Sequence, residues 1–289
     1  VIGDVMLDHY ITADVDRTSP EAPVAIALVR SEYYVAGGAA NVAANLRAMG
    51  AKVNLAGVIG QDEGGEMVRS LLMEKGIRTS FLITDKARPT TLKTRILSRG
   101  QQIIRIDREK KESLTNPLSE RMIDVVIRRT EKLDGVIISD YGKGVCTPAL
   151  IADITRIMKE RGIPVLCDPK GLDYSKYRGV AALTPNFKEA QEASGIVATD
   201  EETLALAARR IMSATGARGL VVTRGADGVS LFQKGKAAIH IPAHAREVYD
   251  VTGAGDTFIS HFGLGVFSGL DFETSVKLGN YASAIAVGK

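Results

Sequence analysis

Residues 135–168 read GVIISDYGKGVCTPALIADITRIMKERGIPVLCD. A short apolar run over Gly135–Ser139 precedes a helical pattern over Pro148–Arg161, and a second apolar run follows over Pro164–Cys167. Short buried runs separated by a helix are typical of a strand–helix–strand unit, in which the two strands lie parallel in one sheet. The segment therefore predicts an α/β fold.

The same alternation continues along most of the chain. We expect further strands at Val1–Met6, Val53–Val58, Val180–Thr184 and Gly219–Thr223, and further helices at Ala39–Met49, Gly64–Lys75, Leu118–Leu133, Phe187–Ser194, Glu201–Thr215, Gly255–Phe267 and Phe272–Val287. Strands that alternate with helices form a mostly parallel sheet covered on both faces. The sequence predicts one doubly wound α/β domain spanning residues 1–289.

Two stretches, residues 9–34 and 88–107, contain no helical pattern. Segments Thr91–Leu97 and Gln102–Asp107 alternate polar and apolar residues as a half-exposed β ribbon does. We expect the two stretches to form a small β-sheet lid beside the main sheet; the alternative is two irregular surface hairpins without a role. Exposed strand edges pair readily, so we also expect a homodimer formed through the lid.

Composition excludes several classes of protein. The 289 residues include 37 Lys and Arg against 34 Asp and Glu, a net charge of +3, which is too balanced for a protein defined by nucleic-acid or membrane binding. No apolar stretch approaches the roughly 18 residues of a membrane-spanning helix, and no leader-like start is visible, so we expect a cytoplasmic location. Cys146 and Cys167 have no metal-like spacing and are expected to be packed thiols.

Polar residues terminate four of the apolar runs. They are Asp140, Asp168, Asn186 and Thr223. In open α/β sheets, ligands bind beyond the carboxyl ends of the strands. Any one of these residues could be a helix cap or a turn residue, but four together indicate a binding site.

The motif with the clearest chemistry is DVTGAGDTF at residues 250–258, directly before a helical pattern. Gly253 and Gly255 leave room for a ligand to approach the backbone, and the N–H groups at the helix start form an anion site. Asp256 beside that site would repel a phosphoryl group, unless it accepts the proton of an attacking hydroxyl. An anion site next to a base is kinase chemistry; the alternative is a glycine-rich turn with Asp256 as a helix-start residue.

A second glycine motif, GGAAN at residues 37–41, opens the expected helix Ala39–Met49. Its small residues would let a polar ligand approach the helix, although tight helix–sheet packing is the alternative. It is not GxGxxG, which argues against a dinucleotide-binding oxidoreductase, and no GxxxxGK[ST] motif is present, which argues against a P-loop enzyme.

These residues resemble a known family. DVTGAGDTF and GGAAN resemble the two signatures of the ribokinase-like (PfkB) carbohydrate kinases. Further segments resemble the branch that phosphorylates D-glycero-β-D-manno-heptose 7-phosphate at C1 for ADP-heptose and lipopolysaccharide synthesis. These segments are GDVMLD (3–8), RTSPEAP (17–23), SDYGKG (139–144), DPK (168–170) and VYD (248–250).

The resemblance implies a role for each matching residue. Asp256 is the expected catalytic base. The expected anion hole consists of Gly253, Ala254 and Gly255. ATP and water-coordinated Mg²⁺ are expected near Asn186, Glu189, Thr223 and Gly225. The sugar hydroxyls are expected to meet Asp8, Gly37, Gly38 and Asn41. A monovalent-cation requirement is left open.

A sugar that already carries a phosphate also needs fixed cations away from the reacting hydroxyl. The candidates are Lys93, Arg95, Lys143 and Lys170, each of which could instead be a solvated surface charge. Tyr141 could stack on a sugar ring or simply pack. The four histidines show no ligand spacing and are given no role.

Other functions remain open at this point. Within the same fold, the substrate could be another sugar or sugar acid, such as fructose or 2-keto-3-deoxygluconate. A sugar- or nucleotide-binding protein without catalysis is the alternative from a different class, although the intact Gly-Ala-Gly-Asp argues against it. The expected partners are a small sugar phosphate and ATP, with no nucleic acid and no membrane.

Overall fold

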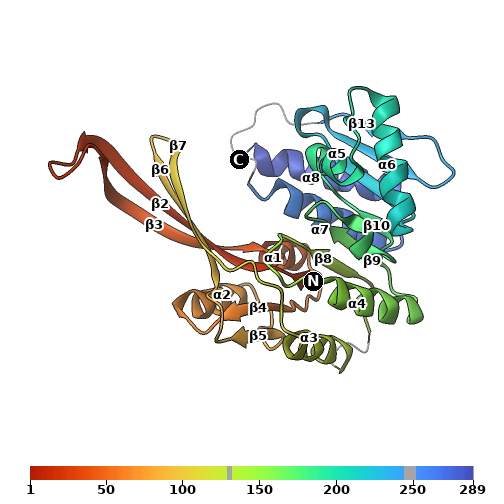
Figure 1. Cartoon of the computed structure of the whole chain (residues 1–289), viewed down its shortest axis with the longest axis horizontal. Helices are drawn as coiled ribbons and strands as arrows, with labels where there is room; N and C mark the ends of the chain where they lie inside the picture. The colour runs from red at the N-terminus through yellow and green to blue at the C-terminus, as the bar shows by residue number, and fades with distance from the viewer. Residues whose placement is uncertain (129–131, 244–251, 289) are drawn as a thin grey trace.

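A computed structural model describes residues 1–128, 132–243 and 252–288, which form an α/β body and a projecting arm (Figure 1). The described residues of the body form a seven-stranded main sheet in the order β1-β8-β9-β10-β11-β12-β13. Neighbouring strands from β1 to β11 pair in parallel, and β12 and β13 are antiparallel. The expected α/β fold with a mostly parallel sheet is thereby confirmed. The strands are β1 Ile2–Gly3, β8 Val136–Ser139, β9 Val165–Asp168, β10 Ala182–Leu183, β11 Gly219–Thr223, β12 Val229–Gln233 and β13 Ile239–Ile241.

Helices cover both faces of this sheet. Ile138 and Cys167 pack in a core cluster with α3, α4, α5 and α6, whereas Ile137 and Leu166 pack with α1, α7 and α8. Adjacent residues of one strand thus serve opposite faces, as the pleat requires. The helices are α1 Ala39–Ala48, α2 Glu63–Glu74, α3 Asn116–Arg128, α4 Pro148–Glu160, α5 Phe187–Ser194, α6 Glu201–Thr215, α7 Ala254–Phe267 and α8 Phe272–Val287.

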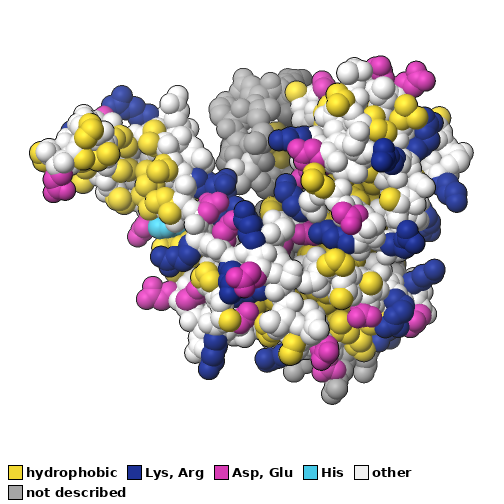
Figure 2. All heavy atoms as spheres, in the orientation of Figure 1, with side chains coloured by type: hydrophobic (Ala, Val, Ile, Leu, Met, Phe, Trp, Pro, Cys, Tyr) yellow, Lys and Arg dark blue, Asp and Glu magenta, His cyan; other side chains and the backbone are white. Residues whose placement is uncertain are grey.

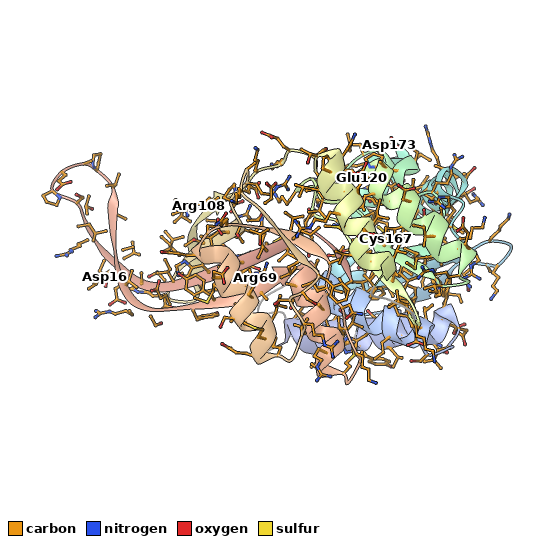
Figure 3. The ribbon with its side chains drawn as sticks, turned by 90° about the horizontal axis from the view of Figure 1, so that it is seen from below. Asp16, Arg69, Arg108, Glu120, Cys167 and Asp173 are labelled. Carbon is orange, nitrogen blue, oxygen red and sulfur yellow. The ribbon has the colours of Figure 1, made fainter. Side chains whose placement is uncertain are left out.

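The arm is a separate four-stranded sheet in the order β3-β2-β6-β7, built from the two stretches in which a small sheet was expected; that it acts as a lid stays a prediction. Its strands are β2 Val5–Thr18, β3 Ala25–Gly38, β6 Thr91–Ser98 and β7 Gln101–Arg108. The hairpin of β2 and β3 extends well away from the body, with Asp16 on its outer part (Figures 1 and 3). A small parallel pair, β4 Gly57–Gly60 and β5 Leu82–Asp85, lies beside the base of the arm and packs with α2.

Some expected boundaries are wrong for a physical reason. The run Val1–Met6, expected to be one strand, divides at Asp4: β1 pairs with β8, while β2 begins at Val5 and joins the arm. The strand expected at Val53–Val58 is instead Gly57–Gly60. Strand membership depends on partners distant in the sequence, which local periodicity does not encode. The end of the helix expected at Leu118–Leu133 includes residues 129–131, which lie outside the described residues.

Both cysteines are buried, and burial raises the pKa of each thiol well above its usual value. Figure 3 shows Cys167 in the interior of the body. The expectation of packed thiols agrees with this placement. None of the described helices combines the length and the apolar character needed to cross a membrane.

Candidate active site

The polar residues expected at the strand ends do meet along one edge of the main sheet. Asp140, Asp168 and Thr223 lie at the carboxyl ends of β8, β9 and β11, and Asn186 follows β10, which lies between β9 and β11. Asn186 and Thr223 form a parallel bridge, and the Thr184 hydroxyl donates to the Asp168 carboxylate at 3.0 Å. This edge is where an open α/β sheet binds its ligands.

Two helices that start at this edge, α1 and α7, lack side-chain caps. They begin after Gly38 and Gly253, whose φ angles are 58° and 76°. The helices with a side-chain cap are α2, α4, α5, α6 and α8, capped by Asp62, Thr147, Asn186, Asp200 and Asp271. At α1 the Ala39 N–H donates to the Asp4 carbonyl at 3.0 Å, so the glycine motif before α7 is the clearer case of helix N–H groups open to a ligand, and such groups attract anions.

The first turn of α7 has the form of an anion hole. The Thr257 N–H donates to the Gly253 carbonyl at 2.9 Å, so the N–H groups of Ala254 and Gly255 precede the first intrahelical bond. A Cβ added at Gly255 would meet nothing within 4 Å, which leaves open space beside this turn. The expected residues Gly253, Ala254 and Gly255 therefore stand together in a suitable arrangement.

Asp256 lies in the same turn and is 3% exposed. One carboxylate oxygen accepts a hydrogen bond from the Tyr141 hydroxyl at 2.6 Å, and the other accepts one from the Asn41 side chain at 2.8 Å. The pKa of Asp256 is raised to about 6, because burial and, to a smaller extent, the charge of Asp8 outweigh the two hydrogen-bond donors, which lower it. A carboxylate oriented from both sides, and ionised at neutral pH, can accept a proton.

The expected sugar-binding residues Asp8, Gly37, Gly38 and Asn41 meet next to Asp256. A Cβ at Gly37 would lie 2.1 Å from the Asp8 carboxylate, so a larger residue there would displace the Asp8 side chain. Asp8 also forms an ion pair with Arg95 at 2.5 Å. Arg95, expected as a phosphate contact, is therefore already paired to a carboxylate, and it lies over the ring of Tyr10.

Lys93 and Lys143 lie close together near the base of the arm. Lys143 pairs with Glu109 at 2.6 Å, and Lys93 lies 3.7 Å from Asp107. Burial lowers the pKa of Lys93, and the positive charge of Lys143 lowers it further. Two partly buried ammonium groups thus lie within interaction range of one another, each with a carboxylate partner, as Arg95 has; their role as phosphate contacts stays a prediction.

Lys170 lies on a different side of the site, at 2.6 Å from Glu189. Glu189 and Asn186 form the capping box at the start of α5, each side chain bonding the backbone of the other. Burial raises the pKa of Asp168 well above its usual value, and the charges of Asp256 and Glu189 raise it further. A cation would relieve this excess of negative charge, and carboxylates are the ligands that Mg²⁺ prefers.

Two further residues expected on the nucleotide side, Thr223 and Gly225, lie at or just after the end of β11. Thr223 ends β11, and Gly225 opens the short 3₁₀ helix Gly225–Asp227 that follows it. His9 stacks on Tyr34. The segment VYD at 248–250 and His244 lie outside the described residues.

The structure assigns Tyr141 a contact that sequence reasoning did not foresee. Stacking on a sugar or simple packing was expected, whereas its hydroxyl donates to Asp256. Asn41, expected to meet sugar hydroxyls, likewise contacts Asp256. The sequence shows that the polar pair Asp140-Tyr141 directly follows a strand, which indicates a place near the site. It does not show that Asp256 is the partner of Tyr141.

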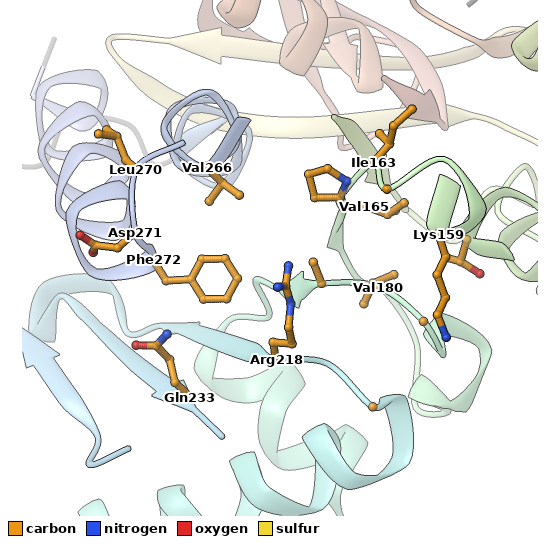
Figure 4. A pocket seen from close by; sticks show the side chains of 16 residues that line it. Lys159, Ile163, Val165, Val180, Arg218, Gln233, Val266, Leu270, Asp271 and Phe272 are labelled. Atoms are coloured by element: carbon orange, nitrogen blue, oxygen red, sulfur yellow. The ribbon is translucent and has the colours of Figure 1, made fainter. Parts of the chain in front are cut away.

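A cavity of about 700 Å³ lies at the opposite end of the main sheet (Figure 4). Its walls include Val165, Val180 and Arg218, at or before the amino ends of β9, β10 and β11, together with Phe272 of α8. Because it opens away from the carboxyl ends of the strands, we do not place the reaction there.

Comparison with known proteins identifies the family of the chain. Residues 1–289 match the model of the pfkB family carbohydrate kinases. The chain belongs to this family. The expectation of a carbohydrate kinase is thereby confirmed, and the resemblance seen in the two glycine motifs holds for the whole chain.

Curated relatives of this kinase include the bifunctional protein HldE of Geobacter sulfurreducens, 44% identical over the whole chain, and that of Citrifermentans bemidjiense, 47% identical. The chain spans 59% of the length of each relative. Among solved structures, the kinase resembles Arabidopsis thaliana ribokinase complexed with ribose and ATP (TM-score 0.77, 20% identity, 100% of this chain and 91% of that chain). It also resembles Escherichia coli phosphofructokinase-2 (TM-score 0.82, 17% identity, 100% and 93%). These two likenesses support the fold.

Proposed function

We propose that the kinase transfers the γ-phosphoryl group of ATP to the C1 hydroxyl of D-glycero-β-D-manno-heptose 7-phosphate, giving the 1,7-bisphosphate for ADP-heptose and lipopolysaccharide core synthesis. The observation that carries the chemistry is Asp256, a buried carboxylate in the uncapped first turn of α7. The segments that resemble the heptose 7-phosphate branch, and the HldE relatives at 42–47% identity, support the choice of sugar.

Each part of the site has a task in this reaction. Asp256 takes the proton from the C1 hydroxyl, and the oxygen of this hydroxyl forms a bond to the γ-phosphorus of ATP. The bond between the γ-phosphorus and the oxygen that bridges it to the β-phosphate breaks, which releases ADP. The N–H groups of the α7 first turn stabilise the charge on the transferring group. The arm covers the sugar and excludes water, which limits hydrolysis of ATP.

On the nucleotide side, the proposed ligands are ATP and Mg²⁺. Asn186, Glu189, Thr223 and Gly225 would border the triphosphate and the ion. When bound, Mg²⁺ neutralises charge on the ATP phosphates. Lys170 orients the Glu189 carboxylate through their ion pair and is proposed to act on this side of the site.

On the sugar side, the proposal requires a place for a second phosphate. Asp8 and the glycine motif at Gly37–Gly38 border the end of the sugar next to Asp256, and Lys93 and Lys143 would bind the 7-phosphate. Charge-assisted hydrogen bonds to phosphate are among the stronger polar interactions in proteins.

The first experiment is an ADP-release assay with Mg-ATP that compares heptose 7-phosphate, unphosphorylated heptose, fructose and 2-keto-3-deoxygluconate. We expect strong turnover with heptose 7-phosphate, weak turnover with unphosphorylated heptose at high concentration, and none with the other two sugars. Preference for an unphosphorylated sugar would contradict the assignment of Lys93 and Lys143 as phosphate contacts, but it would still support kinase activity. Absence of turnover with all four sugars would favour a binding protein.

The raised pKa of Asp256 predicts the pH dependence. Below a pH of about 6 the carboxyl group holds its own proton and can no longer accept one, so kcat/KM should fall about tenfold per pH unit. The profile is measured from pH 5 to 8.5 with heptose 7-phosphate and with unphosphorylated heptose at high concentration. The phosphate of a sugar phosphate also ionises with a pKa of about 6. Unphosphorylated heptose has no such group and is therefore the control. A flat profile with both acceptors would contradict the prediction.

We also propose that two copies pair through their arms. Val29 and Tyr33 of β3 and Ile104 and Ile106 of β7 are about half exposed. Figure 2 shows hydrophobic side chains gathered over the arm. Edge strands carrying exposed apolar side chains favour pairing with another sheet.

The double change Ile104→Lys and Ile106→Lys tests this pairing. We expect a dimer for the unmodified chain and half that mass for the variant, measured by light scattering, because lysine is poorly tolerated in a paired apolar surface. Leu206→Lys on α6, a residue of similar exposure, serves as the control and should leave the dimer intact. A monomeric unmodified chain would rule the proposal out.

A further inference from the structure

The loop of residues 141–145, which follows β8, is attached to a single buried carboxylate. Asp4 is 1% exposed and lies where the chain passes from β1 to β2. Its carboxylate accepts hydrogen bonds from alternate N–H groups of the loop. The donors are Tyr141 (2.8 Å), Lys143 (3.1 Å) and Val145 (3.1 Å). Three amides on one carboxylate fix the course of the loop.

A second carboxylate, that of Asp140, binds the same loop at Gly142. The Gly142 N–H donates to Asp140 at 2.7 Å, and Asp140 is itself held by the Tyr177 hydroxyl and the Lys176 ammonium, each at 2.7 Å. Asp4 and Asp140 lie close enough to Cys146 to resemble a metal site. Their oxygens already accept these hydrogen bonds, so we interpret the group as an anchor for the loop.

This anchored loop carries two groups that face the sugar site. The Tyr141 hydroxyl donates to Asp256 at 2.6 Å, and the Lys143 ammonium belongs to the proposed phosphate pocket. Burial and the charge of Asp256 raise the pKa of Tyr141 well above its usual value, so the hydroxyl keeps its proton and acts as a donor. Through this loop, the buried Asp4 is connected both to the proposed base Asp256 and to the proposed phosphate pocket.

We propose that Asp4 and Tyr141 are positioning residues of the kinase: Asp4 fixes the loop, and the loop holds the Tyr141 hydroxyl on the base and Lys143 at the phosphate. This inference depends on the proposed role of Asp256 and adds how that carboxylate is oriented. Two other ionisable groups interact with Asp256: the charge of Asp8, from β2, raises the pKa of Asp256, and the charge of Asp256 raises the pKa of Asp168, at the end of β9.

Tyr141→Phe is the first test, because phenylalanine retains the ring and removes only the donor. A donor to a carboxylate favours its charged form, so its loss should move the acidic limb of kcat/KM upward by about one pH unit. The KM for heptose 7-phosphate should stay near that of the unmodified enzyme. Ionisation of the substrate affects the variant and the unmodified enzyme equally. A difference between their acidic limbs therefore reflects a change in the ionisation of an enzyme group. An unchanged limb would overturn the proposal.

Asp4→Asn is the second test, since it keeps the size of the side chain but turns an acceptor into a donor against the loop amides. We expect the same upward shift of the limb, together with a KM for heptose 7-phosphate raised at least tenfold. Because Asp4 acts through Tyr141, the double variant with Tyr141→Phe should show the shift of one change only. Additive shifts, or an unchanged limb in folded Asp4→Asn, would overturn the role of Asp4.

Two controls separate this proposal from other effects. Asp271→Ala removes the cap of α8 beside the cavity of Figure 4 and should lower Tm without moving the limb or the KM. Asp256→Asn is measured in parallel. If it retained turnover, the proposed base would be wrong; if it were inactive while Tyr141→Phe behaved like the unmodified enzyme, only the positioning proposal would fail. Should Asp4→Asn not fold, Tyr141→Phe still decides the connection to the base.

Discussion

Replacing Asp256 with asparagine is expected to lower kcat about 10³-fold while the affinity for ATP stays within a few-fold of that of the unmodified enzyme. The carboxylate is the group that takes the proton from the sugar hydroxyl, and a general base contributes 10²–10⁴-fold to a rate. ATP binding should persist because the anion hole is made by the backbone of the α7 first turn, which this change leaves in place. The measurements are ADP release under saturating substrates and direct titration of nucleotide binding.

The fold should tolerate this change. Asparagine has the shape of aspartate, and it removes a buried charge whose desolvation raises the pKa of Asp256. The matched control is Asp271→Asn, the same substitution at the start of α8, which should leave kcat unchanged. Residual turnover above about a tenth of the original value would exclude Asp256 as the base.

The parts of the fold that could be predicted from the sequence are those that local chemistry determines. The expected helices Phe187–Ser194 and Glu201–Thr215 have the bounds found in the structure. Each begins at a capping box, formed by Asn186 or Asp200, and each ends at a glycine in the left-handed conformation. Start and stop signals of this kind lie within a few residues of the helix end, so a single sequence contains them.

The arrangement of strands depends on more distant contacts. The N–H of Asp4 still donates to the carbonyl of Ser139 at the end of β8, whereas the carbonyl of Asp4 accepts from the N–H of Ala39, so the chain leaves the main sheet at this residue. The antiparallel edge β12–β13 was not expected either, because its short segments carry little periodicity. Pairing between segments over a hundred residues apart leaves no trace in a local pattern.

The candidate site shows the same division. The glycines and Asp256 could be recognised because the chemistry of an anion hole with a base needs these residue types in one short segment. The partners of that base come from elsewhere: Asn41 and Tyr141 are 215 and 115 residues away in the sequence. The cations were harder still, since a lysine in the sequence carries no sign of whether it pairs with Glu109, as Lys143 does, or with Glu189, as Lys170 does.

Lys143→Gln is expected to raise the KM for heptose 7-phosphate about 10–100-fold with little change in kcat. A hydrogen bond between charged groups contributes about 1.5–3 kcal/mol, which corresponds to this range, and Lys143 lies away from the transferring group. Lys93 and Lys143 are held close enough to lower the pKa of Lys93, and a doubly charged phosphate would relieve that repulsion. Unphosphorylated heptose lacks the interacting group, so its KM should not change.

Lys170→Gln is the matched comparison, because it removes an ammonium paired at the same 2.6 Å distance to a different glutamate. Its partner Glu189 lies on the proposed nucleotide side, so the KM for ATP should rise and the KM for heptose 7-phosphate should stay constant. The opposite pattern, in which Lys170→Gln weakens the sugar phosphate and Lys143→Gln does not, would move the phosphate pocket from the base of the arm to the edge beside α5. Steady-state kinetics of the two variants, with each substrate varied in turn, therefore separate the two cations by the substrate that each one binds.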